Sequence, residues 1–437
     1  MRDGWQNNGR KNAAATSERW YGDEFGINGK QIMKIIFLNV PGHGHVNPTL
    51  AVTAELVQRG HQVIYYNHPD FAPQIGRCGA EFRPYPEPQP TAVQLNQKAS
   101  NLVSVTIWVL EQSQRLLPWL LEELRREQPD RVVFDSICLW GMQAAHLLGL
   151  PSVASIVTFV QEGVKGMITW RDGLALVRQA LPLMPSLIKN RRQLVRRFGP
   201  EVFPHPQIFP CISQTNLVYT SRAFQPETDF IDDSFHFVGP SINTETRETA
   251  DFPWHLLQNG RPAVYISLGT VYHDKMDFYQ MAFATLADHR AQFVLSAGRT
   301  TDIAALGPVP DNFIVRNFVP QLELLPRVNA FITHGGMNSI NEGLYFGVPL
   351  VVVPQQMEQT LNARQTARHG AAIVLGDRPP YGRTTPTDLS TALDTVLADG
   401  TYRQNAKRIG QSFREAGGYQ RAADLITAVH LRKDAKV

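Results

Sequence analysis

The sequence has little cysteine, and this bears on metal sites and on compartment. Of its 437 residues only three are cysteines, Cys78, Cys138 and Cys211, and no two of them share a metal-binding spacing. Their number is odd, so no disulfide framework is expected. We therefore expect three free thiols in a reducing compartment, which favours a cytoplasmic protein.

The sequence also lacks long apolar runs and a strong excess of charge. No run approaches the roughly 20 apolar residues of a membrane-spanning helix, and the formal net charge is only +3. We expect neither nucleic acid nor a membrane surface as a partner, and a monomer or weak dimer. Residues 1–32 are polar without an apolar centre, which indicates a disordered N-terminal tail and no signal peptide, with Met33 as a natural start.

Short apolar runs alternate with amphipathic stretches in two series, and this pattern predicts the fold. β-Branched runs of this kind suit strands buried on both faces of a parallel sheet. We predict an α/β protein with two facing Rossmann-like domains, residues 33–238 and 263–437, joined by a polar linker at 239–262 and separated by a cleft. The expected strands are residues 35–40, 63–66, 132–134 and 153–159, then 263–268, 293–295, 313–315, 330–332 and 350–353.

Two stretches of the first half are expected to be helical or irregular. Residues 111–127 predict an amphipathic helix that is kinked or restarted at Pro118. Residues 161–210 are rich in aromatics, methionine and proline, and we expect them to contact substrate. Apolar side chains in or near the predicted cleft loops are candidate acceptor contacts, although each taken alone could belong to the core. They are Trp108, Trp140, Phe159, Met167 and Trp170.

Two histidines stand in the loop "PGHGHVNP", residues 41–48, which follows the first predicted strand. Ligands of parallel sheets bind beyond the carboxyl ends of the strands, so His45 should face the cleft. We expect Asn47 to cap the next helix and Pro48 to lie in its first turn. The field of that helix N-terminus should keep the imidazole neutral and able to accept a proton. A capping or packing histidine is the alternative.

The same loop has part of a dinucleotide-binding pattern. Gly42 and Gly44 match its first two glycines, but Asn47 stands where the third belongs. The next predicted strand is followed by Asn67 and His68 rather than an acidic residue. Both departures argue against a dehydrogenase.

Asp135 ends the apolar run of a neighbouring predicted strand, "RVVFD". A carboxylate there should face the same cleft as His45. Bonded to one ring nitrogen, it would fix the tautomer and stabilise the imidazolium that proton transfer creates. Asp135 alone would more often be a helix cap, but the two residues together indicate a general base and its partner.

The stretch "THGGMNSINEG", residues 333–343, predicts an anion site at the start of a helix. Glycines let the backbone approach a ligand, and the free amides of a helix start attract phosphate. His334, Gly336, Asn338 and Ser339 would supply these contacts. Glu342 lies one turn after Asn338, where a carboxylate suits the paired hydroxyls of a ribose. This feature favours a ribose over a 2′-deoxyribose.

Three further predicted strand ends carry residue types that suit a phosphate, a base and sugar hydroxyls. A small turn suits a phosphate, and an aromatic ring can stack on a base. An amide can bond a base edge or ribose, and a carboxylate with an amide can bond sugar hydroxyls. In that order, these residues are Gly269 with Thr270, Phe318, Gln321, and Glu358 with Gln359.

These residues resemble a known family. Residues 318–359 look like the donor-binding signature of the nucleotide-sugar-dependent family 1 glycosyltransferases, and "GHGHVNP" looks like their catalytic-histidine loop. The likeness covers essentially residues 33–430, and the bacterial macrolide-type branch is the most similar by eye. It implies a GT-B fold whose N-terminal domain binds the acceptor and whose C-terminal domain binds the donor.

The resemblance also assigns roles to residues. It implies His45, not His43, as the base and Asp135 as its partner. Diphosphate contacts fall on His334, Gly336, Asn338, Ser339 and Thr270; the ribose falls on Glu342, the base on Phe318 and Gln321, and the sugar on Glu358 and Gln359. The plant signature has tryptophan where Phe318 stands, so we expect looser stacking on the base. It also has tryptophan where Met337 stands, a helix start where we expect the backbone contact to survive.

The implied reaction is an inverting, metal-independent transfer of a hexose, expected to be glucose. The donor would be a UDP-sugar, and the acceptor a hydroxyl of an apolar, aromatic or polycyclic small molecule. Two alternatives remain. A nucleotide-sugar epimerase would need acidic and basic groups aimed at the sugar C2 and would use no acceptor. A non-catalytic auxiliary protein could lose the base and phosphate residues, whereas this chain keeps both sets.

Overall fold

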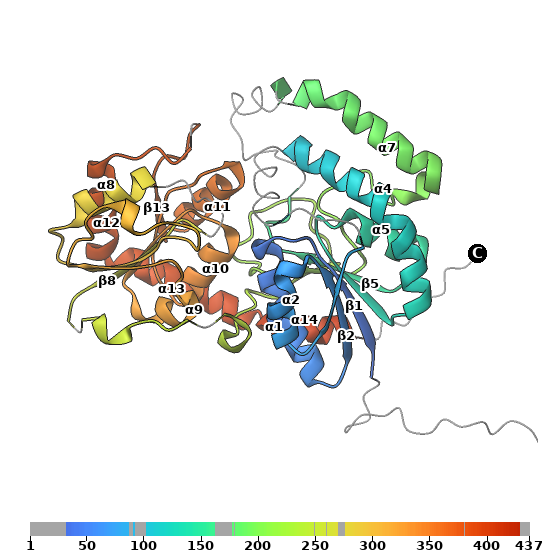
Figure 1. Cartoon of the computed structure of the whole chain (residues 1–437), viewed down its shortest axis with the longest axis horizontal. Coiled ribbons are helices and arrows are strands. Elements are labelled where there is room, and N and C mark those ends of the chain that lie inside the picture. Colours follow the sequence, from blue (N-terminus) through green and yellow to red (C-terminus); the bar gives the residue numbers. More distant parts are fainter. Residues whose placement is uncertain are drawn as a thin grey trace, which may run out of the picture. The chain divides into compact units, whose positions relative to one another are not determined.

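Two parallel β-sheets organise the chain in the computed structural model (Figure 1). The structure describes residues 32–86, 91, 102–161, 177–178, 180–248, 250–258, 260–269, 276–379 and 381–428. Thr270, Met167 and Trp170, three of the predicted site residues, lie outside these ranges. Among the described helices, none combines the length and apolar character that crossing a bilayer requires.

The first sheet has seven strands in the order β3-β2-β1-β4-β5-β6-β7. Its strands are β1 (Lys34–Leu38), β2 (Gln62–Asn67), β3 (Glu81–Pro84), β4 (Arg131–Asp135), β5 (Ser152–Ile156), β6 (Asn216–Val218) and β7 (Phe235–Phe237). The second sheet has six strands in the order β10-β9-β8-β11-β12-β13. They are β8 (Ala263–Ser267), β9 (Gln292–Ser296), β10 (Phe313–Arg316), β11 (Ala330–Thr333), β12 (Leu350–Val352) and β13 (Ala372–Val374).

Both sheets follow the doubly wound pattern, in which the chain starts at a central strand and builds outward on each side. The direction of building reverses between β1 and β4 in the first sheet and between β8 and β11 in the second. Ligands of such sheets bind in the crevice beyond the carboxyl ends of the strands at this reversal. The loops after these four strands are therefore the expected places for chemistry.

Helices cover both faces of each sheet. The α-helices of the described residues are α1 (His43–Gln58), α2 (Ala72–Arg77), α4 (Leu102–Glu127), α5 (Leu139–Leu147), α7 (Met184–Phe198), α8 (Met276–Leu286), α9 (Gln321–Leu324), α10 (Met337–Tyr345), α11 (Met357–Arg368), α12 (Pro386–Ala398), α13 (Gly400–Glu415) and α14 (Gly418–Thr427). Alternation along β1 shows how the faces are separated. Ile35 and Phe37 pack in the cluster that contains α1 and α14, whereas Ile36 and Leu38 pack in the cluster that contains α4 and α5.

The last helix lies with the first half of the chain. α14 packs against α1, and Ala422 and Ile426 belong to the same apolar cluster as Ile35 (Figure 1). The guanidinium of Arg59 adds an ion pair with Asp424 at 2.7 Å. The residue limits that the sequence suggests for the two domains stay a prediction.

Several local expectations differ from the structure. The helix expected at residues 111–127 starts nine residues earlier and continues through Pro118 as α4. Its apolar face packs on the sheet, and that packing outweighs the lost backbone hydrogen bond. The strand expected at 153–159 ends at Ile156. Strands β3, β6, β7 and β13, each three or four residues long, were not expected.

Candidate functional site

A cavity of about 360 Å³ lies between the loops of the two sheets. This volume is within the range of small-molecule sites. His45 lines it from the first half of the chain. Every described residue predicted for the donor also lines it: Gly269, Phe318, Gln321, His334, Gly336, Asn338, Ser339, Glu342, Glu358 and Gln359. The structure therefore brings together side chains that the sequence separates by about three hundred positions.

His45 and Asp135 form a hydrogen-bonded pair at the reversal point of the first sheet. His45 Nδ1 lies 2.8 Å from Asp135 Oδ2. The Asp135 side chain is fully buried, and its other oxygen accepts from the backbone N–H of Ile137 at 2.8 Å. Asp135 thus caps its own turn and also holds the imidazole. Because Nδ1 donates to a carboxylate, Nε2 is the nitrogen with a free lone pair.

The start of α1 differs from the expectation. The helix begins at His43, after Gly42, so Asn47 is not its cap and Pro48 lies inside it. The imidazole is also not governed by the helix field alone. Burial lowers the pKa of His45, but the charge and hydrogen bond of Asp135, with the charge of Glu358, outweigh it and raise the pKa above 6.5. The predicted helix effect is therefore overridden by neighbouring carboxylates.

A buried polar network supports the His45 turn from below. The side-chain amide of Asn39 donates to the His45 backbone carbonyl at 3.2 Å and to the Tyr65 hydroxyl at 2.7 Å. That hydroxyl also lies 2.7 Å from Thr49 Oγ1 on α1. All three supporting side chains are almost fully buried. Such a satisfied network holds the turn in one arrangement.

His43 plays a different part from His45. Its ring packs on Phe71, with centroids 5.0 Å apart. Burial, together with the charges of Arg299 and Arg247, lowers the pKa of His43. A ring that packs on an aromatic side chain and is pushed towards the neutral form fits a packing role at the edge of the cavity.

The start of α10 presents free backbone amides to the cavity. The helix begins at Met337 after Gly336, and no side chain caps its first turn. Gly336, Asn338 and Ser339 of this turn line the cavity. Uncapped N–H groups and the helix dipole together form an anion site. This geometry agrees with the phosphate site that the sequence predicts.

His334 packs closely against Gly336 and Gly269 beside that anion site. A Cβ atom on Gly336 would lie 2.5 Å from its Nε2, and one on Gly269 would lie 2.8 Å from its Cε1. Gly269 also has φ of +86°, which other residues rarely adopt. Burial lowers the pKa of His334 to about 4, although the backbone carbonyl of Ser267 opposes this. At neutral pH His334 can therefore contribute a hydrogen bond but not a positive charge.

Glu342 is held on both carboxylate oxygens. Gln321 Nε2 donates to Oε2 at 2.5 Å, and Arg247 Nη2 donates to Oε1 at 2.6 Å. Arg247 comes from the segment between the two sheets and was not marked by any sequence pattern. An arginine in a polar, turn-rich stretch gives no local signal, because its partner lies 95 positions away.

Phe318 has a neighbour that the sequence did not predict, Arg299. The Arg299 guanidinium carbon lies 4.4 Å from the centre of the Phe318 ring, and Arg299 also forms an ion pair with Glu248. All three residues line the cavity. A guanidinium over an aromatic ring is a cation–π contact, which holds the Phe318 ring in place beside the cavity.

Glu358 and Gln359 lie at the start of α11. The Glu358 carboxylate accepts from Asn362 Nδ2 at 3.0 Å, and its side chain opens into the cavity. Desolvation by the surrounding protein raises the pKa of Glu358, although the hydrogen bond from Asn362 and the charge of His45 oppose this rise. Gln359 Oε1 accepts from the Gln355 backbone N–H at 2.8 Å, which leaves the Gln359 amino group for a ligand.

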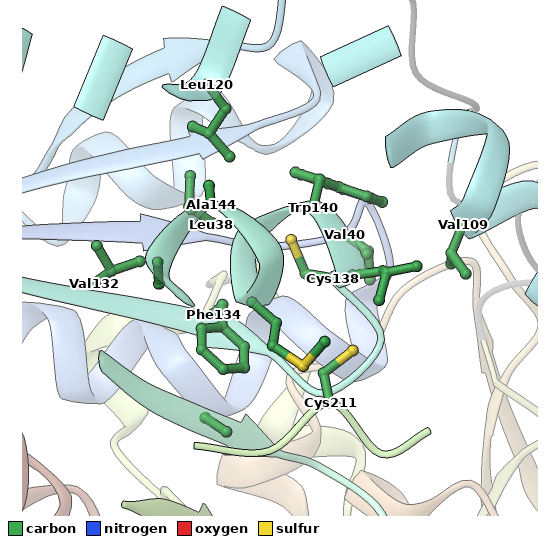
Figure 2. Packing of buried hydrophobic residues seen from close by; sticks show 14 of the residues in the cluster. Leu38, Val40, Val109, Leu120, Val132, Phe134, Cys138, Trp140, Ala144 and Cys211 are labelled. Carbon is green, nitrogen blue, oxygen red and sulfur yellow. The ribbon is translucent and has the colours of Figure 1, made fainter. Parts of the chain in front are cut away.

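Three of the five predicted acceptor residues, Trp108, Trp140 and Phe159, do not line the cavity. Trp140 is fully buried in the cluster that includes Leu38 and Cys138, and Figure 2 shows it among those side chains. Trp108 packs edge-on against it, with ring centroids 6.0 Å apart. Phe159 is 6% exposed and packs on Phe224 at 5.5 Å. Trp108 and Trp140 thus belong to the core of the first sheet, and Phe159 belongs to the cluster that includes Phe331 of the second sheet.

Other apolar side chains of the first half line the cavity instead. They come from α1, from α4, from the turn after Asp135 and from the loop after β5, and all four are aliphatic. They are Leu50, Val105, Ile137 and Val157. Aliphatic residues at strand and helix ends look like core residues in a sequence, so no pattern separated them from the core.

Known proteins resemble the chain along nearly its whole length. The family model of UDP-glucoronosyl and UDP-glucosyl transferases matches residues 235–415. YojK of Bacillus subtilis (strain 168), named an uncharacterized UDP-glucosyltransferase, is 32% identical over 90% of this chain and 96% of its own. The chain belongs to this glycosyltransferase family. Demethyllactenocin mycarosyltransferase of Streptomyces fradiae is 31% identical over 90% of the glycosyltransferase described here and 85% of its own length.

Solved structures agree with this assignment. The glycotransferase of kitacinnamycin matches with a TM-score of 0.76 and 29% identity, over 91% of this glycosyltransferase and 98% of its own chain. CalG4, the calicheamicin glycosyltransferase, matches with a TM-score of 0.71 and 26% identity, over 90% and 97%. The predicted family and fold are thus confirmed. The chain is a nucleotide-sugar-dependent family 1 glycosyltransferase with two Rossmann-like domains of GT-B type.

Proposed function

We propose that this glycosyltransferase transfers a hexose, glucose first among them, from a UDP-sugar to a hydroxyl of an apolar aromatic or polycyclic small molecule. The transfer inverts the anomeric carbon, needs no metal ion and uses His45 as general base. One observation carries the proposal. The imidazole that Asp135 holds at 2.8 Å lines the same cavity as the free amides of α10. We retain the expectations of a cytoplasmic protein and of a monomer or weak dimer.

The base acts through Nε2, because Nδ1 is committed to Asp135. Nε2 takes the proton of the acceptor hydroxyl while the acceptor oxygen bonds to the anomeric carbon. The bond from that carbon to the phosphate oxygen breaks, and UDP leaves with the electron pair. Attack opposite to the leaving group inverts the carbon through an oxocarbenium-like state. Asp135 stabilises the imidazolium, and such a base is typically worth ~10²–10⁴-fold in rate.

The leaving diphosphate gathers negative charge during this step. Hydrogen-bond donors would stabilise this charge: the amides of the first α10 turn, the side chains of Asn338 and Ser339, and a neutral N–H of His334. Gly269 and Thr270 would complete the turn around the phosphates. The amides of α10 are held by the helix before the reaction, so they need no rearrangement as the charge develops. We expect a chelator to leave the rate unchanged.

Residues further along the cavity would hold the remaining parts of the donor. Glu342 would bind the ribose hydroxyls, which favours UDP over TDP, and Phe318 with Gln321 would bind the base. Glu358 and Gln359 would bind hydroxyls of the sugar. The name of YojK, a UDP-glucosyltransferase, supports glucose.

The acceptor end is proposed from the apolar lining and from relatives. Leu50, Val105, Ile137 and Val157 offer an apolar surface near His45. Oleandomycin glycosyltransferase of Streptomyces antibioticus, which is 29% identical over 90% of this chain and 90% of its own, is named for a natural product. A natural-product acceptor with an apolar ring system would fit such a lining.

The test is a screen followed by one substitution. UDP-glucose, UDP-N-acetylglucosamine and TDP-sugars are incubated with a phenol panel, and the anomeric configuration of the product is read by proton NMR. An inverted product that forms only with an acceptor excludes an epimerase. His45→Ala should abolish O-transfer while UDP still binds, and His68→Gln, outside the cavity, should leave both unchanged. Full transfer by the His45 variant would refute the mechanism.

A further inference from the structure

Arg247 and Glu342 form a largely buried ion pair that no sequence pattern predicted. Arg247 follows a single 3₁₀ turn, η4 (Thr244–Thr246), in the segment between the two sheets. Its guanidinium donates to Glu342 Oε1 at 2.6 Å, and the two side chains are only 17% and 7% exposed. An unpaired carboxylate at that depth is costly, so Arg247 stabilises the Glu342 side chain in this position.

The two partners of Glu342 leave a defined capacity for a ligand. Arg247 donates to one oxygen and Gln321 to the other. A carboxylate has about four acceptor sites, so about two stay open. The 2′- and 3′-hydroxyls of a ribose need two acceptors side by side, and a 2′-deoxyribose needs only one. Because each oxygen is tied to a different element, the carboxylate plane cannot turn freely.

Arg247 also compensates a charge that would otherwise oppose the donor. Glu342 lies one helical turn after Asn338, whose turn lines the anion side of the cavity. A bare carboxylate at that distance would repel a diphosphate. Paired with a guanidinium, Glu342 keeps its acceptor atoms and loses most of this repulsion.

We propose that Arg247 is a positioning residue for donor recognition. It fixes the Glu342 carboxylate to accept both hydroxyls of a ribose, and it thereby makes the enzyme prefer a ribonucleoside diphosphate to a 2′-deoxyribonucleoside diphosphate. The inference rests on the proposed donor site. The neighbouring Glu248 supports it, because its ion pair with Arg299 ties the same short segment to the loop beside Phe318.

The experiment measures UDP and 2′-deoxy-UDP binding by titration calorimetry. Arg247→Met should weaken UDP binding about 10- to 100-fold, the worth of a hydrogen bond to a charged group. Binding of 2′-deoxy-UDP should change less, so the ratio of the two affinities should collapse. Arg247→Lys should restore part of the ratio. Arg261→Met is the matched control, since Arg261 lies in the same segment but bonds Arg290 and Gln258 outside the cavity.

Kinetics and a double variant separate positioning from mere structure. The donor KM of Arg247→Met should rise more than kcat falls. Because Arg247 acts through Glu342, adding Arg247→Met to Glu342→Gln should weaken UDP binding no further. If Arg247→Met is unfolded at the assay temperature, Arg247→Gln is measured for the same ratio.

Two results would overturn the proposal. One is a variant that binds UDP as tightly as the wild type, or more tightly, with the ratio unchanged; tighter binding would mean that Arg247 blocks the site. The other is a double-mutant cycle in which the effects of Arg247→Met and Glu342→Gln on UDP binding are additive. If instead the wild type does not bind UDP, or Glu342→Gln keeps full affinity and ratio, the proposed donor site itself is wrong, and the role of Arg247 falls with it.

Discussion

The side-chain amide of Asn338 donates a hydrogen bond to the backbone carbonyl of Gly44 at 3.3 Å. In an α-helix that carbonyl would accept from the N–H four residues later, but that residue is Pro48, which has none. A proline inside α1 thus frees an acceptor that the first turn of α10 can use. The bond ties the proposed phosphate loop directly to the residue before His45.

Substitution of Asn338 should weaken UDP binding, because its side-chain amide bonds the Gly44 carbonyl and is proposed to bond the diphosphate. Asn338→Ala removes one hydrogen bond and should weaken UDP binding by about 0.5–1.5 kcal/mol, or 2- to 10-fold. Asn338→Asp should weaken it more, because the carboxylate faces both the Gly44 carbonyl and the incoming diphosphate. Titration calorimetry with UDP measures both.

The control for this pair uses a similar contact outside the cavity. Asn405 Nδ2 donates to the Gly370 carbonyl at 3.1 Å. Asn405→Asp creates the same clash of oxygens far from any proposed ligand, so it should lower the melting temperature without changing UDP affinity. An Asn338→Asp protein that binds UDP as well as Asn338→Ala would show that no anion approaches this turn.

The sequence located the candidate site well for a physical reason. Alternating strand and helix signals predict a doubly wound sheet, and such a sheet places loop residues at one edge. His45, Asp135 and His334 each follow or end a strand beside a reversal point, so strand position alone predicts that they meet a ligand crevice. Glycine-rich turns then marked where the backbone comes close.

The features that the sequence did not predict depend on contacts between distant segments. The start of α1 at His43 was missed because Asn47-Pro48 is also a good helix start. Arg247 meets Glu342 only after both sheets have formed. Trp140 was misjudged because a large aromatic side chain suits a core and a ligand site equally well, and only packing decides between them.

Gly336→Ala should damage the donor site without straining the backbone. Gly336 has φ of −59°, which alanine adopts freely, but the new Cβ would lie 2.5 Å from His334 Nε2. His334 must therefore move. We expect the donor KM to rise about tenfold or more, since overpacking costs about 1–3 kcal/mol. Steady-state kinetics with varied UDP-sugar measure this.

A glycine with open surroundings provides the comparison. A Cβ on Gly76, within α2, would meet nothing within 4 Å. Gly76→Ala should leave the donor KM unchanged and raise stability slightly, because alanine is favoured over glycine in helices. If Gly336→Ala behaved in the same way, the close packing of His334 would have no bearing on donor binding.

The pH profile should report the His45–Asp135 pair. The pKa of His45 is raised above 6.5, so the imidazole stays protonated, and inactive as a base, to a higher pH than a free histidine. The rate constant kcat/KM should therefore rise with pH along a limb centred above 6.5. Asp135→Asn removes the carboxylate charge and leaves burial to dominate. Its limb should move to lower pH while the plateau falls by ~10²–10⁴-fold, measured between pH 5 and 9.

The direction of the shift distinguishes a base partner from a simple turn cap. A cap would affect stability, through the bond from the Ile137 N–H to Asp135 Oδ1, but asparagine retains an acceptor for that N–H. An unmoved limb in Asp135→Asn would therefore mean that Asp135 only caps its turn. His68→Gln is the control, because His68 Nδ1 accepts from the Asp70 backbone N–H at 3.2 Å in an exposed turn outside the cavity. That variant should keep both the limb and the plateau of the wild type, since His68 has no route to the proton of the acceptor.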